Sequence, residues 1–385
     1  MRKLPLLLFL LVILTACSLS AYQPKPADQA ETETEAETQT VPPDTSITIL
    51  GTGDVLMHNT VIDSGRQGGE YSFEHLYAPV QHLVDAADHA SLCLETALAG
   101  PASGYTGYPL FNSPDALALA LKTTGFDLIN TAGNHCMDRG LEGGVRTLQV
   151  LREAGLDTIG TSDSAETAAH LYIKEVKGFK LAYLAYSFST NGIPVPSSAP
   201  WYFSALDREK ILADIAAVRP EADLVILLLH WGVEYSPSPT AEQTSWAREF
   251  CEAGADLILG SHPHVIQPAE LLDINGQKKL VVYSMGNSIG HQIGVERNSG
   301  VLVSVEFTRY GVDGSIRLSD YHFEPTYLHH YYQDGRLLFR AVPITETIEN
   351  IHQGNETVLT EGDIPVLQSV YQSTMNTLQN MGLEL

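Results

Sequence analysis

The stretch that decides the fold runs from Asp223 to His262. It opens with "DLVILLLH" (223–230), continues with the helical pattern "AEQTSWAREFCEAG" (241–254) and returns to an apolar run in "DLILGSH" (256–262). Two apolar runs of strand length on either side of a helix form a strand-helix-strand unit. Because the strands of such a unit are parallel and covered by helices, this stretch predicts an α/β fold whose ligands gather beyond the carboxyl ends of the strands.

The same alternation extends upstream and changes downstream. The strand pattern "SITILGTGDV" (46–55) precedes the helical pattern "PVQHLVDAADHA" (79–90), and "GGVRTLQVLREAG" (143–155) is again helical. From about Pro268 the chain shows strands joined by short turns, which predicts antiparallel strands that close or extend the sheet. A last helical pattern covers residues 365–382.

Composition limits the classes of function. The chain has 385 residues, and 44% of them are hydrophobic, which is enough for a sizeable core. Its 46 acidic and 22 basic residues give a formal net charge of -24, and no basic patch is segregated in the sequence. Such a chain repels nucleic acid, so we expect no nucleic-acid partner.

The first residues have the pattern of an export signal. "MRKLPLLLFLLVILTACS" (1–18) has two basic residues and then an apolar stretch, from Leu4 to Leu14, that is too short for an ordinary membrane span. Its end, "LTAC", resembles the bacterial lipobox, in which the cysteine becomes the lipidated first residue. We therefore expect a lipid on Cys17 and a location on the extracytoplasmic face of the cell membrane. The alternative is an uncleaved anchor with a chance cysteine, which tethers the domain on the same side.

The sequence predicts four parts. Residues 1–17 form the lipoprotein signal peptide. Residues 18–45 are rich in Glu, Thr, Gln and Pro and cannot bury a core, so they form a disordered acidic stalk. Residues 46–345 form the main domain, and residues 346–385 form a C-terminal helical tail.

The remaining cysteines do not indicate a disulfide framework. Cys93, Cys136 and Cys251 are an odd number and have no CxxC spacing. Each adjoins an apolar strand or helix pattern, so we expect buried thiols.

Side chains that can bind metal ions or transfer protons lie where the predicted strands end. Two carboxylates, two amides and four imidazoles share this position, and because strand ends meet at one rim of a sheet they predict a site with oxygen and nitrogen ligands, suited to Mn, Fe or Zn. The residues are Asp54, Glu95, Asn134, His135, His230, His262, His264 and Asn287. Within "SHPHV", His262 and His264 are two apart, so an extended backbone stiffened by Pro263 points them the same way.

Each of these residues has a simpler interpretation when taken alone. Asp54 after a glycine could cap a turn, Glu95 could be an exposed strand end, and His230 could be a buried core histidine. Only the joint pattern favours a functional site. His58, four residues beyond Asp54, and His291 remain open.

The motifs together resemble a known family. Their order and spacing are similar to those of the CapA family of bacterial capsule-synthesis proteins, which is associated with poly-γ-glutamate production, and the resemblance runs from about Thr48 to Phe307. The motifs are "GDVLMH", "CLET", "AGNHCMDRG", "LHWGVEY", "GSHPHVIQP" and "YSMGNSIG". This resemblance implies a domain of the calcineurin-like metallophosphoesterase type, with an α/β fold arranged as a four-layer α/β/β/α sandwich and with one or two divalent metal ions.

The resemblance also implies roles for the rim residues. The expected metal ligands are Asp54, Glu95 at the bridging position, Asn134, His230, His262 and His264. His135 is then the catalytic histidine that donates a proton or hydrogen bond to the reacting oxyanion, and Asp138 is its orienting partner.

Two positions depart from the pattern of the ordinary phosphoesterases. Their first motif is Asp-x-His, whereas this chain has Leu56 where the histidine is expected, and the bridging aspartate is replaced by Glu95. One imidazole is therefore missing unless His58 replaces it.

Two functions are compatible with these features. One is a membrane-anchored protein in the synthesis, export or processing of an anionic surface polymer such as poly-γ-glutamate, with a metal-dependent hydrolase-type site directed at a phosphoester or amide. The other is a non-catalytic accessory subunit that binds the nascent polymer or the membrane polyglutamate synthase subunits. Loss of activity in His135→Ala separates them.

Overall fold

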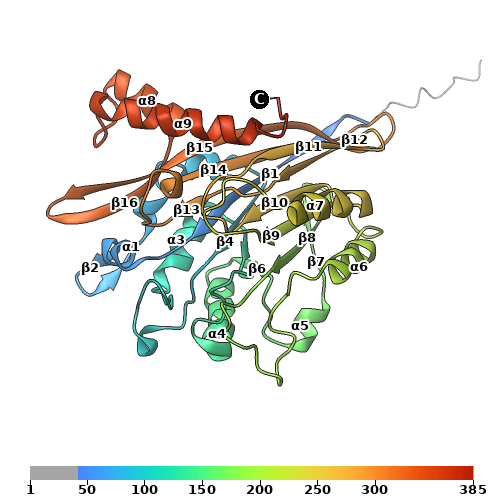
Figure 1. Cartoon of the computed structure of the whole chain (residues 1–385), viewed down its shortest axis with the longest axis horizontal. Coiled ribbons are helices and arrows are strands. Elements are labelled where there is room, and N and C mark those ends of the chain that lie inside the picture. The colour runs from blue at the N-terminus through green and yellow to red at the C-terminus, as the bar shows by residue number, and fades with distance from the viewer. Residues whose placement is uncertain (1–41, 385) are drawn as a thin grey trace, which may run out of the picture. The chain divides into compact units, whose positions relative to one another are not determined.

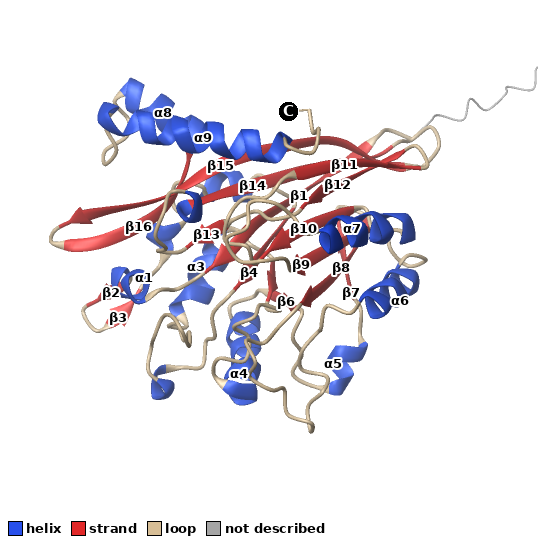
Figure 2. Cartoon of the chain, in the orientation of Figure 1, coloured by secondary structure: helices blue, strands red, loops and turns tan. Residues whose placement is uncertain are grey.

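The structure, a computed structural model, describes residues 42–384. In this part of the chain two mixed β-sheets lie against each other, with helices on their outer faces (Figure 1 and Figure 2). The predicted signal peptide, Cys17 and all but the end of the predicted stalk lie outside the described residues.

The first sheet has the order β16-β15-β14-β1-β4-β5-β6, and β13 pairs with β1. Strands β1, β4, β5 and β6 are parallel, whereas β14, β15 and β16 extend the sheet in antiparallel fashion, as the sequence predicts. The strands are β1 (Thr45–Val55), β4 (His89–Leu94), β5 (Leu128–Asn130), β6 (Asp157–Ile159), β13 (Asn287–Ile289), β14 (Ser299–Arg309), β15 (Ile316–Gln333) and β16 (Arg336–Pro343).

The second sheet has the order β11-β12-β10-β9-β8-β7. Its inner strands are parallel, and the antiparallel strands β11 and β7 form its edges. The strands are β7 (Tyr172–Val176), β8 (Phe179–Ser187), β9 (Leu224–His230), β10 (Leu257–Ser261), β11 (Ala269–Ile274) and β12 (Gln277–Val282). The prediction of antiparallel strands after Pro268 holds where β12 pairs with β11. It is wrong where β12 pairs with β10 and where β13 pairs with β1, since both of these pairings are parallel.

Helices cover the outer face of each sheet because their apolar sides pack against it. Leu92 of the first sheet lies in one apolar cluster with Leu121, and Val225 of the second sheet lies in another with Phe250. On the first sheet these helices are α1 (Asn59–Ser64), α2 (Gln81–Asp85), α3 (Ala116–Thr124) and α4 (Gly140–Glu153); on the second they are α6 (Arg208–Val218) and α7 (Ala241–Ala253). The helical pattern over 79–90 yields only α2, because His89 and Ala90 enter β4.

A third apolar cluster lies between the sheets. Ile49 and Val303 of the first sheet share it with Ile226 and Leu259 of the second, and all four side chains are buried. The layers therefore run helix, sheet, sheet, helix, which confirms the four-layer α/β/β/α prediction.

The remaining elements lie at the periphery. A two-stranded hairpin is made by β2 (Arg66–Gln67) and β3 (Glu70–Tyr71), and α5 (Ala165–Ala169) follows β6. Near the C-terminus, α8 (Ile344–Gln353) and α9 (Ile364–Gln379) lie against β15, and α9 also contacts β14 and β11 (Figure 1). Short 3₁₀ turns are η1 (Glu74–Leu76), η2 (Pro101–Ser103), η3 (Glu296–Asn298) and η4 (Glu361–Asp363).

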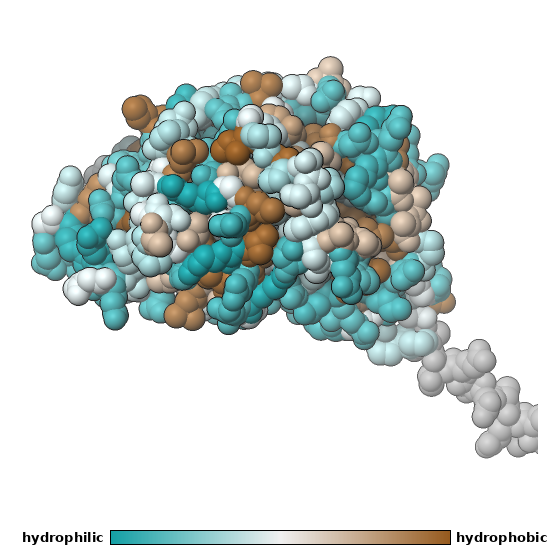
Figure 3. Space-filling view, turned by 90° about the horizontal axis from the view of Figure 1, so that it is seen from below, coloured by the Kyte–Doolittle hydropathy of each residue, from teal (hydrophilic) through white to brown (hydrophobic). Residues whose placement is uncertain are grey.

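The surface is mixed in character. On the face drawn in Figure 3, hydrophilic residues cover most of the area, and apolar residues gather near its middle. Among residues 42–384, no helix has both the length and the apolar character needed to cross a bilayer.

Candidate metal centre

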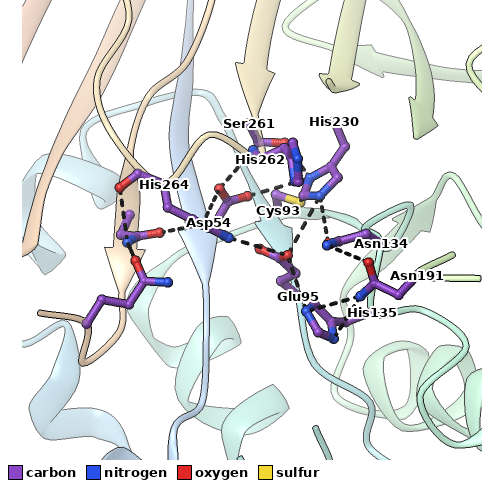
Figure 4. Close-up of polar contacts among 12 residues, drawn as sticks. Asp54, Cys93, Glu95, Asn134, His135, Asn191, His230, Ser261, His262 and His264 are labelled. Atoms are coloured by element: carbon purple, nitrogen blue, oxygen red, sulfur yellow. Dashed lines mark hydrogen bonds and ion pairs between the residues drawn. The ribbon is translucent and has the colours of Figure 1, made fainter. Parts of the chain in front are cut away.

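The predicted site residues converge at the carboxyl ends of the central strands of both sheets. They comprise Asp54 near the end of β1, Glu95 directly after β4, Asn134 and His135 in the loop after β5, His230 at the end of β9, and His262 and His264 after β10. Figure 4 shows their side chains facing one another across the junction of the two sheets.

The backbone brings Asp54 into this junction through a close approach of two segments. The pairing of β1 with β4 shifts register between Thr52 and Asp54, and the Asp54 N–H donates to the carbonyl of Gly286 at 3.0 Å. A Cβ on the preceding Gly53 would lie 1.9 Å from that same carbonyl oxygen, so only glycine fits there. The glycine before the acid is therefore part of how the acid is positioned.

Two groups of buried donor atoms could hold metal ions. One consists of Asp54, Cys93 and His230; the other consists of Glu95, His262 and His264. Within each group the donor atoms lie within 4.8 Å of one another.

Glu95 lies at the centre of the imidazoles. Its Oε1 is 3.7 Å from Nε2 of His230, 3.8 Å from Nε2 of His264 and 4.0 Å from Nε2 of His135. On the other side, Oδ1 of Asp54 lies 3.7 Å from Nδ1 of His230. His230 is thus shared between the two carboxylates.

Several of these donor atoms lack a hydrogen-bond partner among the described residues. They are Oδ1 of Asp54, both carboxylate oxygens of Glu95, and Nδ1 of His262, all of them buried. Leaving a buried polar atom unsatisfied costs about 1–3 kcal/mol, and more when the group is charged. Oxygen and nitrogen donors that converge without partners fit divalent cations, which would satisfy all four atoms at once.

Burial and neighbouring charges shift the pKa values of the side chains in the centre. Burial raises the pKa of Glu95 well above its ordinary value, and the charge of Asp54 acts in the same direction. Burial also acts to raise the pKa of Asp54, but the hydrogen bond and charge of His264 outweigh it and lower the pKa. Burial opposes the charged form of His264 too, yet the two carboxylates raise its pKa to about 9. The pKa values of His264 and the two acidic groups therefore depend on one another.

Asn134 joins the centre through its amide. Its Oδ1 lies 3.0 Å from Nε2 of His230, and its Nδ2 donates to Oδ1 of Asn191 at 3.1 Å. Nδ2 of Asn191 lies 3.3 Å from Nε2 of His135. Asn191, which was not among the predicted site residues, therefore contacts both members of the Asn134–His135 pair.

Asp138 holds the ring of His135 through its Nδ1 atom. Its Nδ1 lies 2.8 Å from Oδ2 of Asp138, and that same oxygen accepts the N–H of Phe111 at 2.7 Å. Because the carboxylate fixes the proton on Nδ1, Nε2 is the atom that can take up or give away a proton. The structure thus brings together the pair that the resemblance implies.

The backbone around the centre is strained. His262 has φ 97° and His264 has φ 58°, so both lie in the left-handed region and not in the extended conformation expected from the sequence. Tyr235 at φ 63° and Asn191 at φ 53° adopt the same region beside them. Such conformations cost about 1–3 kcal/mol each and cluster at functional sites. The two histidines reach one centre by this strain and not by strand periodicity.

His58 and His291, to which the sequence assigns no role, lie near the centre but outside both donor groups. Nδ1 of His58 accepts the N–H of His291 at 3.1 Å. Asn287 lies next to a predicted ligand, since its Oδ1 is 3.0 Å from Nδ1 of His264. We therefore assign Asn287 the role of orienting that imidazole.

Cys93 was expected only as a buried thiol, and the structure places it in the first donor group. Its Sγ lies 3.5 Å from Nδ1 of His230. A signal was present in the sequence, because Cys93 lies two residues before Glu95 at the end of a strand, and alternate residues of an extended chain share a face.

Comparison with known proteins gives consistent matches. A family model described as "Bacterial capsule synthesis protein PGA_cap" matches residues 48–292. The PGA biosynthesis protein CapA of Bacillus subtilis (strain 168) is 33% identical over 193 residues, which are 50% of this chain and 50% of that one. The capsule biosynthesis protein CapA of Bacillus anthracis is 27% identical over 256 residues, which are 64% of this chain and 60% of that one.

Solved structures are more distant. The 5'-nucleotidase precursor from Thermus thermophilus is 14% identical, with a TM-score of 0.47, over 86% of this chain and 59% of that chain. The chain spans 50% to 60% of the length of the two capsule proteins it matches.

Proposed function

The chain belongs to the PGA_cap family of bacterial capsule synthesis proteins, and from that premise we propose that it is a metal-dependent hydrolase acting on an anionic surface polymer such as poly-γ-glutamate. The observation that carries the proposal is the set of buried donor atoms on Asp54, Glu95 and His262 that have no hydrogen-bond partner within residues 42–384. Burying unsatisfied carboxylate oxygens at the meeting point of two sheets lowers stability unless a cation fills the centre, so these atoms support metal binding. The His135–Asp138 pair beside them supports hydrolysis over binding alone.

The donor chemistry limits the metal. Carboxylate, amide and imidazole donors suit Mn, Fe or Zn, and the presence of two donor groups supports one or two ions per chain. In this proposal Glu95, His262 and His264 hold one ion, and Asp54 and His230 with the Asn134 amide hold the other. A bound ion would supply Lewis acidity and a water of lowered pKa at neutral pH.

The chain's own residues supply the proton chemistry. His135 projects Nε2 toward the Glu95 side of the centre, and Asp138 fixes the tautomer and direction of its ring. Nε2 is therefore suited to protonate the leaving group of a scissile phosphoester or amide, or to hydrogen-bond its oxyanion. The side chain of His135 is 8% exposed, which leaves it within reach of substrate but shielded from bulk water.

We extend the proposal to the cellular location. A lipid on Cys17 would hold the domain on the extracytoplasmic face of the membrane, beside the membrane synthase that makes the polymer. The lipobox-like "LTAC" and the acidic segment that follows it support this part. Substituting Cys17→Ala should move the protein from the membrane fraction to the soluble fraction, and an unchanged distribution would remove the lipid anchor from the proposal.

The decisive experiment pairs metal content with activity. Purified protein is analysed for metals and assayed against γ-glutamyl oligomers and phosphoesters, together with Asp54→Asn, His264→Ala and His135→Ala. We expect His135→Ala to keep its metal and lose turnover, and the other two variants to lose both. His352→Gln, at an exposed position on α8, is the matched histidine control and should behave as wild type.

One observation favours a non-catalytic accessory role instead. Leu56 is buried where an imidazole is expected, and Nδ1 of His58 is occupied by the N–H of His291. A metal-loaded protein that is inert on both substrate panels, but that binds polymer equally well as wild type and as His135→Ala, would favour this role over catalysis.

A further inference from the structure

A hollow of about 480 Å³ opens on the His264 side of the metal centre. Tyr235 and Arg297 line it at the end next to the centre, and residues of α9 line its other wall. None of its lining residues has a role in the centre described above.

The hollow and the metal centre share a wall. The ring of Tyr235 lies 6.0 Å from the ring of His264, measured between centroids. Asn287, whose Oδ1 contacts His264, donates its Nδ2 to the main-chain carbonyl of Arg297 at 2.7 Å. A ligand in the hollow would therefore be separated from His264, a predicted metal ligand, by the ring of Tyr235.

Arg297 stands out among the arginines of residues 42–384. Its guanidinium lies 3.7 Å above the Tyr235 ring centroid and has neither a carboxylate partner nor a hydrogen-bond acceptor in that part of the chain. Every other arginine there makes an ion pair or donates to carbonyl oxygens. Stacking fixes the plane of the guanidinium and leaves its N–H edge free, which is the geometry that binds a carboxylate with two hydrogen bonds.

The opposite wall offers hydroxyl groups. Ser369, Ser373 and Thr377 line the hollow and are spaced by four residues along α9, so they form one stripe on the helix surface. Glu296 is the one carboxylate among the lining residues, and the charge of Arg297 offsets it. In a chain of net charge -24 this hollow is therefore a place where a polyanion is not repelled.

From these contacts we infer that the hollow binds an extended polycarboxylate chain, with Arg297 holding one carboxylate and the α9 hydroxyl stripe contacting the next part of the chain. This inference rests on the proposed function, since it places the polymer next to the candidate centre, on the far side of the Tyr235 ring. A single small anion needs only Arg297, whereas the stripe suits a longer ligand.

Binding of a labelled γ-glutamyl oligomer to the purified protein, followed by fluorescence anisotropy at fixed salt, tests the inference. Arg297→Gln should weaken binding about tenfold, the order expected for losing a hydrogen-bonded charge. Arg317→Gln, which removes the same charge from an exposed site on β15, should bind as wild type. Glu296→Gln should bind equally well or more tightly, because it removes a like charge. Ser373→Glu should weaken a long oligomer more than a short one.

The outcomes separate this inference from the function on which it rests. If wild type binds the oligomer and Arg297→Gln weakens binding no more than Arg317→Gln does, the hollow is not the polymer site, although the proposed function stands. If wild type does not bind the oligomer at all, the proposed polymer fails together with the inference. Inorganic phosphate is added as a competitor in the same assay. If Arg297→Gln changes only the competition by phosphate and not the binding of the oligomer, Arg297 binds a small oxyanion and the inference is overturned.

Discussion

Oδ1 of Asn134 and Nε2 of His230 lie 3.0 Å apart, although the two residues follow strands of different sheets. Asn134 follows β5 of the first sheet, and His230 ends β9 of the second. Their contact exists only when the inter-sheet cluster around Ile49 and Ile226 is formed. The candidate centre is therefore complete only when the two sheets are packed, so we expect an ion bound there to stabilise the whole fold.

The first prediction concerns stability in the presence of metal. Adding Mn or Zn to chelator-treated protein should raise the melting temperature, because an ion that binds only the folded state contributes about 2.7 kcal/mol at a hundred times its Kd. Differential scanning calorimetry across a metal titration measures this. Asp54→Asn should lose most of the shift, whereas the exposed-site variant His352→Gln should keep it. An identical shift in Asp54→Asn and wild type would show that the ion binds elsewhere.

The second prediction concerns the stability of the metal-free protein, in which removing a predicted metal ligand should be stabilising. Both carboxylate oxygens of Glu95 are buried without hydrogen-bond partners among the described residues, so this side chain destabilises the apo form. Glu95→Gln should raise the free energy of unfolding of the metal-free protein by about 1–3 kcal/mol and should reduce the stabilisation by metal. Urea denaturation with and without chelator measures both effects. Glu296→Gln, on the surface, should change neither, and a destabilised apo Glu95→Gln would contradict the prediction.

Strongly periodic segments made part of the fold predictable. "DLVILLLH" predicts a strand buried on both faces, and β9 spans Leu224–His230 with every residue buried. The helical pattern over 241–254 matches α7, whose first turn is capped by the Thr240 side chain. The edge strand β7, Tyr172–Val176, was missed because a half-exposed strand lacks an apolar run. The assignment of strands to two sheets came from the resemblance, since local periodicity does not specify which strands pair.

The site was predictable where residues directly follow an apolar strand. That rule finds Asp54, Glu95 and His230, because the strands pin the positions of these residues. It does not find Asn191, which lies four residues beyond the end of β8 in an irregular loop that contains none of the sequence motifs. Arg297 could not be found from sequence, since the stacking of its guanidinium on Tyr235, with no carboxylate partner in the described part of the chain, depends on its neighbours in space.

The third prediction tests Asn191. Its side chain contacts Asn134 and His135, so Asn191→Ala should lower kcat about tenfold or more through loss of orientation, with metal stoichiometry unchanged. Asn191→Asp keeps an acceptor for the Asn134 amide but removes the donor to His135. It should therefore retain metal affinity and still lose turnover. Steady-state kinetics with metal analysis on the same samples measures both, and equal kcat in all three proteins would exclude a positioning role.

The last prediction concerns a histidine between the sheets and outside the metal centre. Nδ1 of His89 on β4 lies 2.9 Å from Oη of Tyr183 on β8, and its Nε2 is buried without a partner among residues 42–384. Burial lowers the pKa of His89 below its ordinary value of 6.5, although Asp127 and Asp157 act to raise it. The fold therefore favours neutral His89, and its contribution to stability is present above pH 6.5 and is lost as the pH falls below that value.

Replacing His89→Gln should therefore flatten the acid side of the stability profile. Wild type loses up to about 1.4 kcal/mol per pH unit from this group below about pH 6.5, since the unfolded chain binds a proton that the native state excludes. The glutamine variant cannot bind that proton, so its free energy of unfolding should fall less steeply from about pH 6.5 to about pH 5. Tyr183→Phe is the matched control: it should be less stable at every pH by about 1 kcal/mol but keep the wild-type slope. Urea denaturation at half-unit pH steps measures the three slopes, and an unchanged slope in His89→Gln would mean that the native state protonates His89 as readily as the unfolded chain does.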